Sequence, residues 1–216
     1  NDESLNEAKH MARCALNPIT MNGGRYVIKP AKKAKKVAVI GGGIGGMECA
    51  RILTLRGHNV TIYEKTGVLG GVFIPASNFD FKENDKRLID WYRKQIKDLK
   101  IKVKLNTEIT DVTKLDADEI VVATGARARK LRMANADRCI DAVDYLNGKE
   151  VGENVVIIGG GLTGCEIAYD LFLKGKKPVI VEAKQDLMAV RGLCLANSSY
   201  LRDYFKAYKV PVYLNS

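Results

Sequence analysis

The sequence predicts an α/β fold of two tandem units, each built around a parallel sheet. Short apolar runs end in glycines, which is typical of buried parallel strands that turn directly into a helix. Residues at helical spacing follow each run, and another apolar run follows each helix. The plan also repeats, because Gly41 and Gly159 are 118 positions apart and so are Glu64 and Glu182. An internal repeat of strand–helix–strand units therefore organises the chain.

The first unit opens with the apolar run 36–40. Met47, Ala50 and Leu53 then recur at helical spacing until Gly57 ends the helix. A later amphipathic helix has one apolar face that includes the Trp91–Tyr92 pair, and we expect this pair in the core. The expected elements are strands at 36–40, 59–63, 101–105 and 119–123 and helices at 44–56 and 84–99.

The second unit restarts the plan at Asn154. An apolar strand again runs into three glycines, and the helix after them points Ala168, Leu171 and Phe172 inward. The expected elements are helices at 142–146 and 164–174, a helical face over 201–208, and strands at 155–158, 179–181 and 210–214.

Composition excludes several classes of protein. Of the 216 residues, 46% are hydrophobic and 28% are charged, as in soluble globular proteins. No run of 18 apolar residues exists and the N-terminus is polar, so we expect no membrane span and no signal peptide. The five cysteines form no C-x-x-C pair. Their pattern favours a reduced, cytoplasmic setting and excludes the adjacent dithiol of disulfide reductases.

The net charge of +10 is concentrated in one place, since five of the positive charges lie between Lys29 and Lys36. Such a run can bind nucleic acid or acidic lipid, but no aromatic side chain is interleaved with these lysines. We interpret the run as a solvated linker and expect no nucleic-acid partner. It divides an N-terminal segment, 1–35, from two predicted domains, 36–127 and 128–216.

The motif Gly41–Gly46 predicts a dinucleotide site. It satisfies G-x-G-x-x-G, follows a strand, opens a helix and has Glu64 at the end of the next strand. Gly41 makes the tight turn, Gly43 lets the backbone approach a pyrophosphate, and Gly46 lets helix and strand pack closely. The helix N-terminus offers N–H groups and partial positive charge, while Glu64 is expected to accept hydrogen bonds from ribose hydroxyls.

The loop after Glu64 extends this site. Gly70 and Gly71 follow the acid by six and seven positions, which lets a second loop approach the bound dinucleotide. We assign Lys65, Gly70 and Gly71 to the same site. The competing interpretation is an ordinary flexible loop.

A second fingerprint stands at Gly159–Gly164, with Glu182 as its acid. Gly159, Gly161 and Gly164 are assigned the roles of the three glycines in the first motif. Glu182 would repel a 2′-phosphate and pair with a free 2′-hydroxyl, so we favour NADH over NADPH here, a preference that Lys184 tempers.

Two fingerprints, the acid with its Gly-Gly pair, and Ala123, Thr124 and Gly125 after a strand resemble the two-dinucleotide-domain flavoproteins. This resemblance implies that the first unit binds FAD, that the second binds NAD(P)H, and that the Ala-Thr-Gly element closes the crossing between them. The motif Cys14–Pro18 ahead of the basic linker narrows the resemblance. It is similar to the C-terminal region of the 2,4-dienoyl-CoA reductase, 2-enoate reductase and trimethylamine dehydrogenase family.

The narrower resemblance implies an NADH-dependent flavin and iron–sulfur oxidoreductase that reduces an activated alkene. In that family an FMN-binding barrel comes first and a four-cysteine iron–sulfur site follows, whose last cysteine matches Cys14. Residues 1–13 contain no cysteine, so Cys14 cannot hold a cluster alone. We expect the barrel, with FMN and the cluster, to be a missing part of the same parent chain. No residue here is assigned as a catalytic acid, base or nucleophile.

Two other functions stay open from the sequence. One is an ADP-binding module without turnover, since trimethylamine dehydrogenase holds only ADP at the corresponding site. The other is the electron-input subunit of glutamate synthase, which shares both fingerprints but not the Cys14 motif. The second repeat stops after the strand that matches 101–105, so we expect an incomplete second unit in a truncated chain, not active alone.

Overall fold

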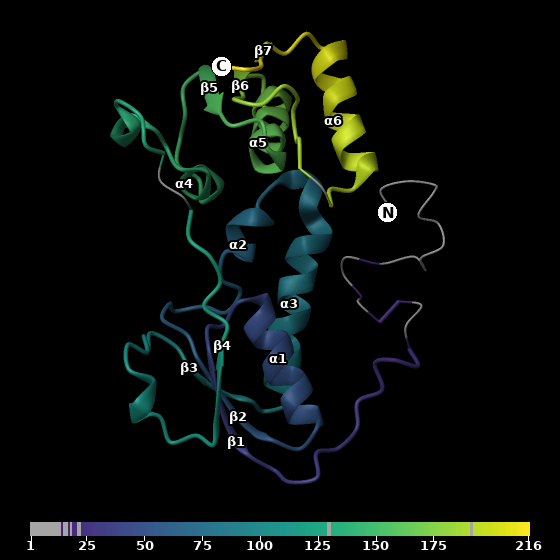
Figure 1. The fold of residues 1–216 in the computed structure, drawn as a ribbon, viewed down its shortest axis with the longest axis vertical. Helices are drawn as coiled ribbons and strands as arrows, with labels where there is room; N and C mark the ends of the chain where they lie inside the picture. The colour runs from purple at the N-terminus through teal and green to yellow at the C-terminus, as the bar shows by residue number, and fades with distance from the viewer. Residues whose placement is uncertain (1–13, 15–16, 18, 21–22, 129–130, 191) are drawn as a thin grey trace. The chain divides into compact units, whose positions relative to one another are not determined.

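The computed structural model describes residues 14, 17, 19–20, 23–128, 131–190 and 192–216 (Figure 1). The chain divides into two compact units. The first unit comprises residues 24–139, and most of the described residues of the second lie in 140–216. Each contains a sheet whose strands are all parallel, so the predicted α/β class with two parallel sheets is confirmed.

The first unit has a four-stranded sheet in the order β3-β2-β1-β4. This order places the first strand in the centre, which is why its residues can form a continuous apolar run. The strands are β1 (Lys36–Ile40), β2 (Asn59–Tyr63), β3 (Lys102–Lys104) and β4 (Glu119–Val122), and the helices are α1 (Ile44–Leu55), the short α2 (Phe73–Ala76) and α3 (Glu83–Asp98). Single 3-10 turns lie at Asp80–Lys82, Val112–Lys114 and Ala136–Arg138.

Strand register brings the candidate site together. In β1, Val39 is paired with Ile62 of β2 on one side and with Val121 of β4 on the other. Because all three strands are parallel, their carboxyl ends meet at one edge of the sheet. The glycine-rich loop, Glu64 and the Ala-Thr-Gly element follow these three strands, so the fold gathers them at that edge.

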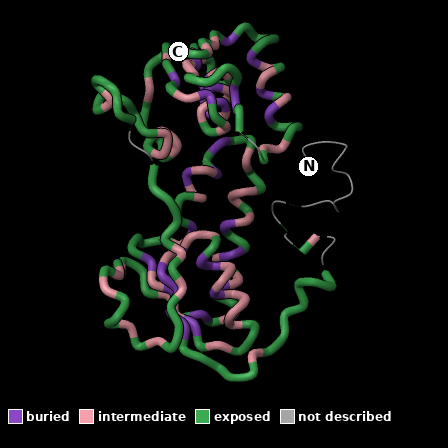
Figure 2. The backbone as a smooth tube through the Cα atoms, viewed as in Figure 1, coloured by how far each residue is buried: buried purple, intermediate pink, exposed green. Residues whose placement is uncertain are grey.

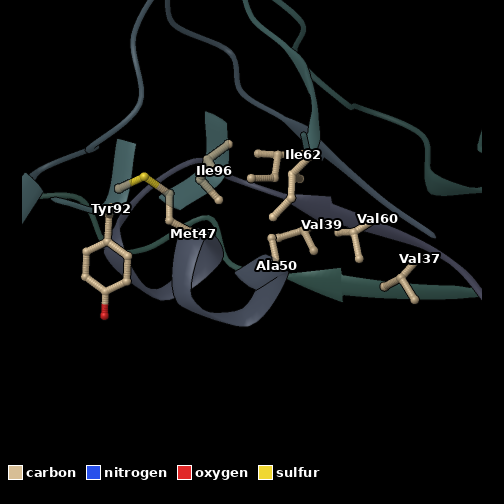
Figure 3. Packing of buried hydrophobic residues seen from close by; sticks show 9 residues of the cluster. Val37, Val39, Met47, Ala50, Val60, Ile62, Tyr92 and Ile96 are labelled. Atoms are coloured by element: carbon tan, nitrogen blue, oxygen red, sulfur yellow. The ribbon is translucent and has the colours of Figure 1, made fainter. Parts of the chain in front are cut away.

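The core of this unit lies between the sheet and helices α1 and α3 (Figure 3). Val39 and Ile62 from the sheet and Met47 and Ala50 from α1 are fully buried. Burying a side chain such as Val39 or Ile62 contributes roughly 1.5–3 kcal/mol relative to exposure. The predicted spacing of Met47 and Ala50 therefore marks the face of α1 that packs on the sheet.

The Trp91–Tyr92 pair does not behave as one unit. Tyr92 is buried, as predicted, but Trp91 is 43% exposed, so the prediction for Trp91 is wrong. The guanidinium of Arg51 lies 5.4 Å from the centre of the Trp91 ring and also forms an ion pair with Glu48. Trp91 thus packs on the surface beneath a cation instead of in the core.

The second unit has a three-stranded sheet in the order β5-β6-β7. Its elements are α4 (Ala142–Leu146), β5 (Asn154–Ile158), α5 (Leu162–Leu173), β6 (Lys177–Val181), α6 (Leu195–Ala207) and β7 (Val212–Tyr213). Ala168 and Leu171 are fully buried as predicted, whereas Phe172 is half-buried. Figure 2 shows the burial of each part of the chain by colour. Helix α6 begins six residues before the face that the sequence predicts.

Two lysines of the basic run have structural partners. Lys35 lies 2.5 Å from Glu119 and Lys36 lies 2.9 Å from Asp116, and all four side chains are largely exposed. Exposed pairs of this kind contribute little to stability, which fits the interpretation of the run as a solvated linker. None of the helices in the described residues is long and apolar enough to cross a membrane.

Candidate dinucleotide-binding sites

The first fingerprint loop has room only for glycine at its turn and at its helix contact. Gly41 has a φ of +107°, its N–H donates to the carbonyl of Tyr63 at 2.8 Å, and an added Cβ would lie 2.3 Å from the Ala123 carbonyl oxygen. At Gly46 an added Cβ would lie 1.9 Å from the carbonyl oxygen of Gly41. The loop is therefore packed between helix α1 on one side and the Ala-Thr-Gly element on the other, and glycine is required at both contacts.

Helix α1 begins with its backbone donors available. Its N-cap, Gly43, has no side chain to cap the helix, and the first turn holds no acidic residue. The first hydrogen bond within the helix runs from the N–H of Met47 to the carbonyl of Gly43. A Cβ added to Gly43 would meet no atom within 4 Å, so the space in front of this N-terminus is open. An uncapped helix N-terminus beside open space suits a phosphate group.

Glu64 is fixed against this loop. Its Oε2 accepts a hydrogen bond from the N–H of Gly42 at 2.7 Å, and its Oε1 accepts from the N–H and hydroxyl of Thr66 at 2.8 and 2.9 Å. Burial raises the pKa of Glu64, but these hydrogen bonds outweigh burial and leave the pKa below its ordinary value. The carboxylate is thus held ionised, with acceptor capacity left for one further donor such as a ribose hydroxyl.

The Gly70–Gly71 loop lies directly on the fingerprint. The N–H of Gly70 donates to the carbonyl of Gly42 at 2.8 Å, and Gly43 and Gly70 form an isolated parallel bridge. Both loop glycines have positive φ, and an added Cβ at Gly71 would lie 3.1 Å from the Cα of Gly43. This loop is therefore a paired part of the site. Lys65 is exposed beside it.

The Ala-Thr-Gly element joins the site from the other side. The N–H of Ala123 donates to the carbonyl of Ile40 at 2.8 Å, and the carbonyl of Ala123 is the group that excludes a side chain at Gly41. Thr124 and Gly125 follow at the exposed end, and Gly125 has a φ of +71°. The structure thus brings the fingerprint glycines, Glu64, the Gly-Gly loop and Ala123 together, while Lys65 and Gly125 are exposed.

The second fingerprint has nearly the same geometry. The N–H of Gly159 donates to the carbonyl of Val181 at 2.8 Å, and an added Cβ at Gly164 would lie 1.9 Å from the carbonyl oxygen of Gly159. The carboxylate of Glu182 accepts from the N–H of Gly160 at 2.6 Å. Its other oxygen accepts from the N–H of Lys184 at 2.8 Å.

The start of α5 completes the parallel between the two sites. Its N-cap, Gly161, makes no side-chain cap, and a Cβ added there would meet no atom within 4 Å. Helix α5 therefore also offers backbone donors to open space, as α1 does.

The two sites differ in their surroundings. The loop that lies on the second fingerprint has Met188 and Ala189 where the first has Gly70 and Gly71. Met188 occupies the place of Gly70; it has a φ of +52°, and its N–H donates to the carbonyl of Gly160 at 2.7 Å. The loop on the second fingerprint thus has at Met188 the positive φ and the hydrogen bond that the first has at Gly70. The ammonium of Lys184 donates to the carbonyl of Ala189 at 3.0 Å.

Two residues with contacts in the first site, Thr66 and Arg93, were not predicted from the sequence. A hydroxyl two positions after the acid is a signal that could have indicated Thr66, because Ser and Thr often bond locally in turns. Arg93 contacts the Gly-Gly loop from a distant helix, and no local pattern predicts such a contact.

The cysteines in the described residues differ in their exposure. Cys14 is exposed, and no group of three or more His, Cys, Asp or Glu side chains among the described residues could hold a metal. The described residues therefore do not supply a complete set of four ligands for an iron–sulfur cluster. Burial raises the pKa of Cys165 to about 12 and also raises that of Cys49, so neither thiol is activated as a nucleophile.

Comparisons with known proteins agree with this geometry. The chain is similar to cinnamate reductase of Clostridium sporogenes, with 44% identity over 207 residues that cover 94% of this chain and 31% of that protein. It is also similar to NADH oxidase of Thermoanaerobacter brockii, with 37% identity over 185 residues that cover 81% of this chain and 28% of that protein.

A solved complex of 2-naphthoyl-CoA reductase with 2-naphthoyl-CoA has a TM-score of 0.83 and 32% identity, covering 94% of this chain and 32% of that one. The chain thus spans about a third of the length of these relatives. The predicted resemblance to such reductases is confirmed. Residues 35–216 also match the profile described as pyridine nucleotide-disulphide oxidoreductase, and the chain belongs to that family.

Proposed function

We propose that this chain binds FAD on its first unit and NADH on its second, and that it serves as the electron-input region of a longer enoate or dienoyl-CoA reductase. One observation carries the proposal. The two fingerprint loops have nearly the same backbone geometry, but the loop that lies on each has Gly70 and Gly71 in the first unit and Met188 and Ala189 in the second. The two sites are therefore built alike but equipped for different dinucleotides.

The residues of the first site would divide the work of holding FAD. The N–H groups at the start of α1 bind the pyrophosphate, and Gly43 leaves the space that it needs. Glu64 accepts from the ribose, while its bond to Gly42 holds the loop in place. Gly161 and Glu182 take the same roles toward NADH. When bound, NADH and FAD supply the hydride donor and the hydride acceptor.

The preference for NADH over NADPH rests on Glu182. Its carboxylate is fixed at the end of β6, where a 2′-phosphate would bring like charges together. The Lys184 ammonium, which could offset that repulsion, is engaged by the Ala189 carbonyl. We expect a Lys184→Ala variant to keep its affinity for NADH.

The rest of the function belongs to the longer protein. We infer a cytoplasmic parent chain in which an N-terminal barrel carries FMN and the iron–sulfur site to which Cys14 contributes. The support is that the relatives are about three times as long as this chain and that cinnamate reductase is among them. The alkene substrate would bind in that barrel.

Two matched variants test the cofactor assignment. A Cβ added at Gly43 or Gly161 would meet no protein atom within 4 Å, and both residues have a φ near −70° that any residue adopts. Gly43→Val and Gly161→Val should therefore fold while filling the space for pyrophosphate. Calorimetric titration of the 216-residue chain should show FAD binding lost only in Gly43→Val and NADH binding lost only in Gly161→Val.

Flavin absorbance and ADP titration together distinguish the FAD assignment from the ADP-binding module. A yellow protein with a flavin absorbance band supports the FAD assignment, whereas a colourless protein that binds ADP but not FAD supports the ADP module. If the unmodified chain bound neither FAD nor NADH at millimolar concentration, the proposal would be wrong.

A further inference from the structure

Each unit contains an arginine that contacts the loop lying on its fingerprint. In the first unit, Nε and Nη2 of Arg93 on α3 donate to the carbonyl of Leu69 at 3.0 and 2.7 Å. In the second unit, Nη2 of Arg202 on α6 donates to the carbonyl of Leu187 at 2.5 Å. Leu69 and Leu187 occupy the same place in the repeat, 118 positions apart.

The contact is kept although its surroundings have changed. Arg93 follows its carbonyl partner by 24 positions, whereas Arg202 follows its partner by only 15. The Gly70–Gly71 turn of the first unit is replaced by Met188 and Ala189 in the second. A guanidinium that donates to the Leu carbonyl is therefore common to both loops, although the arginines lie at different distances along the chain and the turn residues differ.

The position of this carbonyl explains why the contact matters. A Cβ added to Gly42 would lie 2.4 Å from Cδ2 of Leu69, so the leucine side chain is packed on the fingerprint. The next residue, Gly70, donates its N–H to the carbonyl of Gly42. Arg93 thus holds a segment that is both hydrogen-bonded to and packed on the loop expected to bind pyrophosphate. In the second unit a Cβ added to Gly160 would likewise lie 2.5 Å from Cδ2 of Leu187.

The arginines are not engaged mainly by acids. Arg93 lies 3.2 Å from Asp90, but that side chain is 73% exposed and the pair contributes little. Arg202 lies 3.0 Å from Asp186, which is 53% exposed. The carbonyl contacts are part-buried and charge-assisted, which makes them the stronger interactions of both side chains.

We propose that Arg93 and Arg202 are positioning residues, which hold the second loop of each unit against the fingerprint and thereby set the width of the passage for the cofactor pyrophosphate. This inference rests on the proposed function, because it assigns the passage to a dinucleotide. Neither arginine is a catalytic residue, since each acts through the backbone of the loop.

Binding of a nucleotide series to the 216-residue chain tests this role. In Arg93→Ala, the dissociation constants for FAD and ADP should rise by about tenfold, as expected for loss of a charge-assisted hydrogen bond. The constant for AMP, which lacks the second phosphate, should change by less than about twofold, and NADH binding should not change. Arg202→Ala should weaken NADH by about tenfold and leave FAD unchanged.

Three controls separate positioning from general stability. Lys94→Ala removes an exposed cation from the same helix and should leave all dissociation constants unchanged. Because removing Arg93 can unfold the unit, Arg93→Lys is measured beside Arg93→Ala. Its dissociation constants for FAD and ADP should rise by less than in Arg93→Ala, and its constant for AMP should again change least. Without ligand, hydrogen exchange at the Gly70 amide should accelerate in Arg93→Ala, while the amides in the middle of α1 keep their protection.

The outcomes distinguish this inference from the proposed function. If the unmodified chain binds FAD but Arg93→Ala binds it equally well, the inference is overturned and the proposed function stands. Equal losses for AMP and ADP would also overturn it, because the loop would then not act on the pyrophosphate. If the unmodified chain binds neither FAD nor ADP, both fail.

Discussion

At the scale of single residues, Gly46 shows most directly why the fingerprint needs glycine. A Cβ there would lie 1.9 Å from the carbonyl oxygen of Gly41, and this oxygen belongs to backbone that cannot rotate away. We expect Gly46→Ala to lower the free energy of unfolding by about 1–3 kcal/mol through overpacking. Urea denaturation followed by circular dichroism measures this change.

The neighbouring glycine provides the control. Gly45 is also in α1, but a Cβ there meets no atom within 4 Å. Gly45→Ala should therefore raise the free energy of unfolding by about 0.5–1 kcal/mol, because alanine favours a helix. Equal effects of the two substitutions would contradict the close contact between Gly46 and Gly41.

Glu64 makes a second prediction at this scale, on pH. Hydrogen bonds hold its pKa in the folded state below the ordinary value of 4.5, although burial opposes them. A carboxylate with a depressed pKa stabilises the fold fully above its ordinary pKa, and this contribution is lost as pH falls through the folded-state pKa. Glu64→Gln should therefore be less stable at pH 7 and lose less stability between about pH 5 and pH 3.

Urea midpoints measured from about pH 3 to pH 7 check this expectation. Asp116→Asn is the matched control, because its side chain is 88% exposed and its ion pair with Lys36 is on the surface, so it should change the midpoint by much less than Glu64→Gln. If Glu64→Gln lost as much stability on acidification as the unmodified chain, the hydrogen bonds from Gly42 and Thr66 would not stabilise the ionised carboxylate.

At the scale of elements, a buried acid connects α4 to α5. The carboxylate of Asp170 accepts from the Tyr145 hydroxyl at 2.5 Å and from the Lys174 ammonium at 2.7 Å. Asp170 is only 3% exposed, so water cannot fully replace a hydrogen bond that its carboxylate loses. Tyr145→Phe should lower the free energy of unfolding by about 1–3 kcal/mol, measured by urea denaturation.

Tyr208→Phe is the control for Tyr145→Phe, because it removes the hydroxyl of a tyrosine that is 58% exposed. It should change the free energy of unfolding by less than about 0.5 kcal/mol. The two variants would unfold alike only if the Tyr145 hydroxyl bond did not stabilise the packing of α4 on α5.

The elements also show what a sequence can predict. The strands and the helices after each fingerprint were predictable, because glycines mark their ends and apolar residues mark their inner faces. Helix α2 was not, since its four residues are too few for a period and include Pro75. The first turns of α6 were missed for a related reason, because Asn197, Ser198 and Ser199 there interrupt the apolar pattern.

The same limit applies to the site. Gly41, Gly46 and Glu64 were predictable because their spacing is local and their roles are set by backbone geometry. The contact of Arg93 with Leu69 spans 24 positions and depends on where α3 packs. The exposure of Trp91 likewise depends on a cation from α1. Such contacts arise from tertiary packing, which periodicity does not encode.

At the scale of the whole molecule, each unit has its own sheet and its own buried residues. The core around Val39, Met47 and Ile62 belongs entirely to the first unit, while Leu171 and Ile180 are fully buried in the second. The residues of each proposed site also come from one unit. A ligand that binds one site should therefore protect the unit that supplies that site.

This leads to a prediction for ligand-dependent stability. At a concentration of 100 times its dissociation constant, a ligand stabilises the state that binds it by about 2.7 kcal/mol. Hydrogen exchange of the 216-residue chain should thus slow in α1 and β2 when FAD is added, and in α5 and β6 when NADH is added. Gly43→Val should abolish the FAD effect alone, because it fills only the first pyrophosphate space. Protection by FAD that appeared equally in both units, or that survived in Gly43→Val, would contradict the assignment of one dinucleotide to each unit.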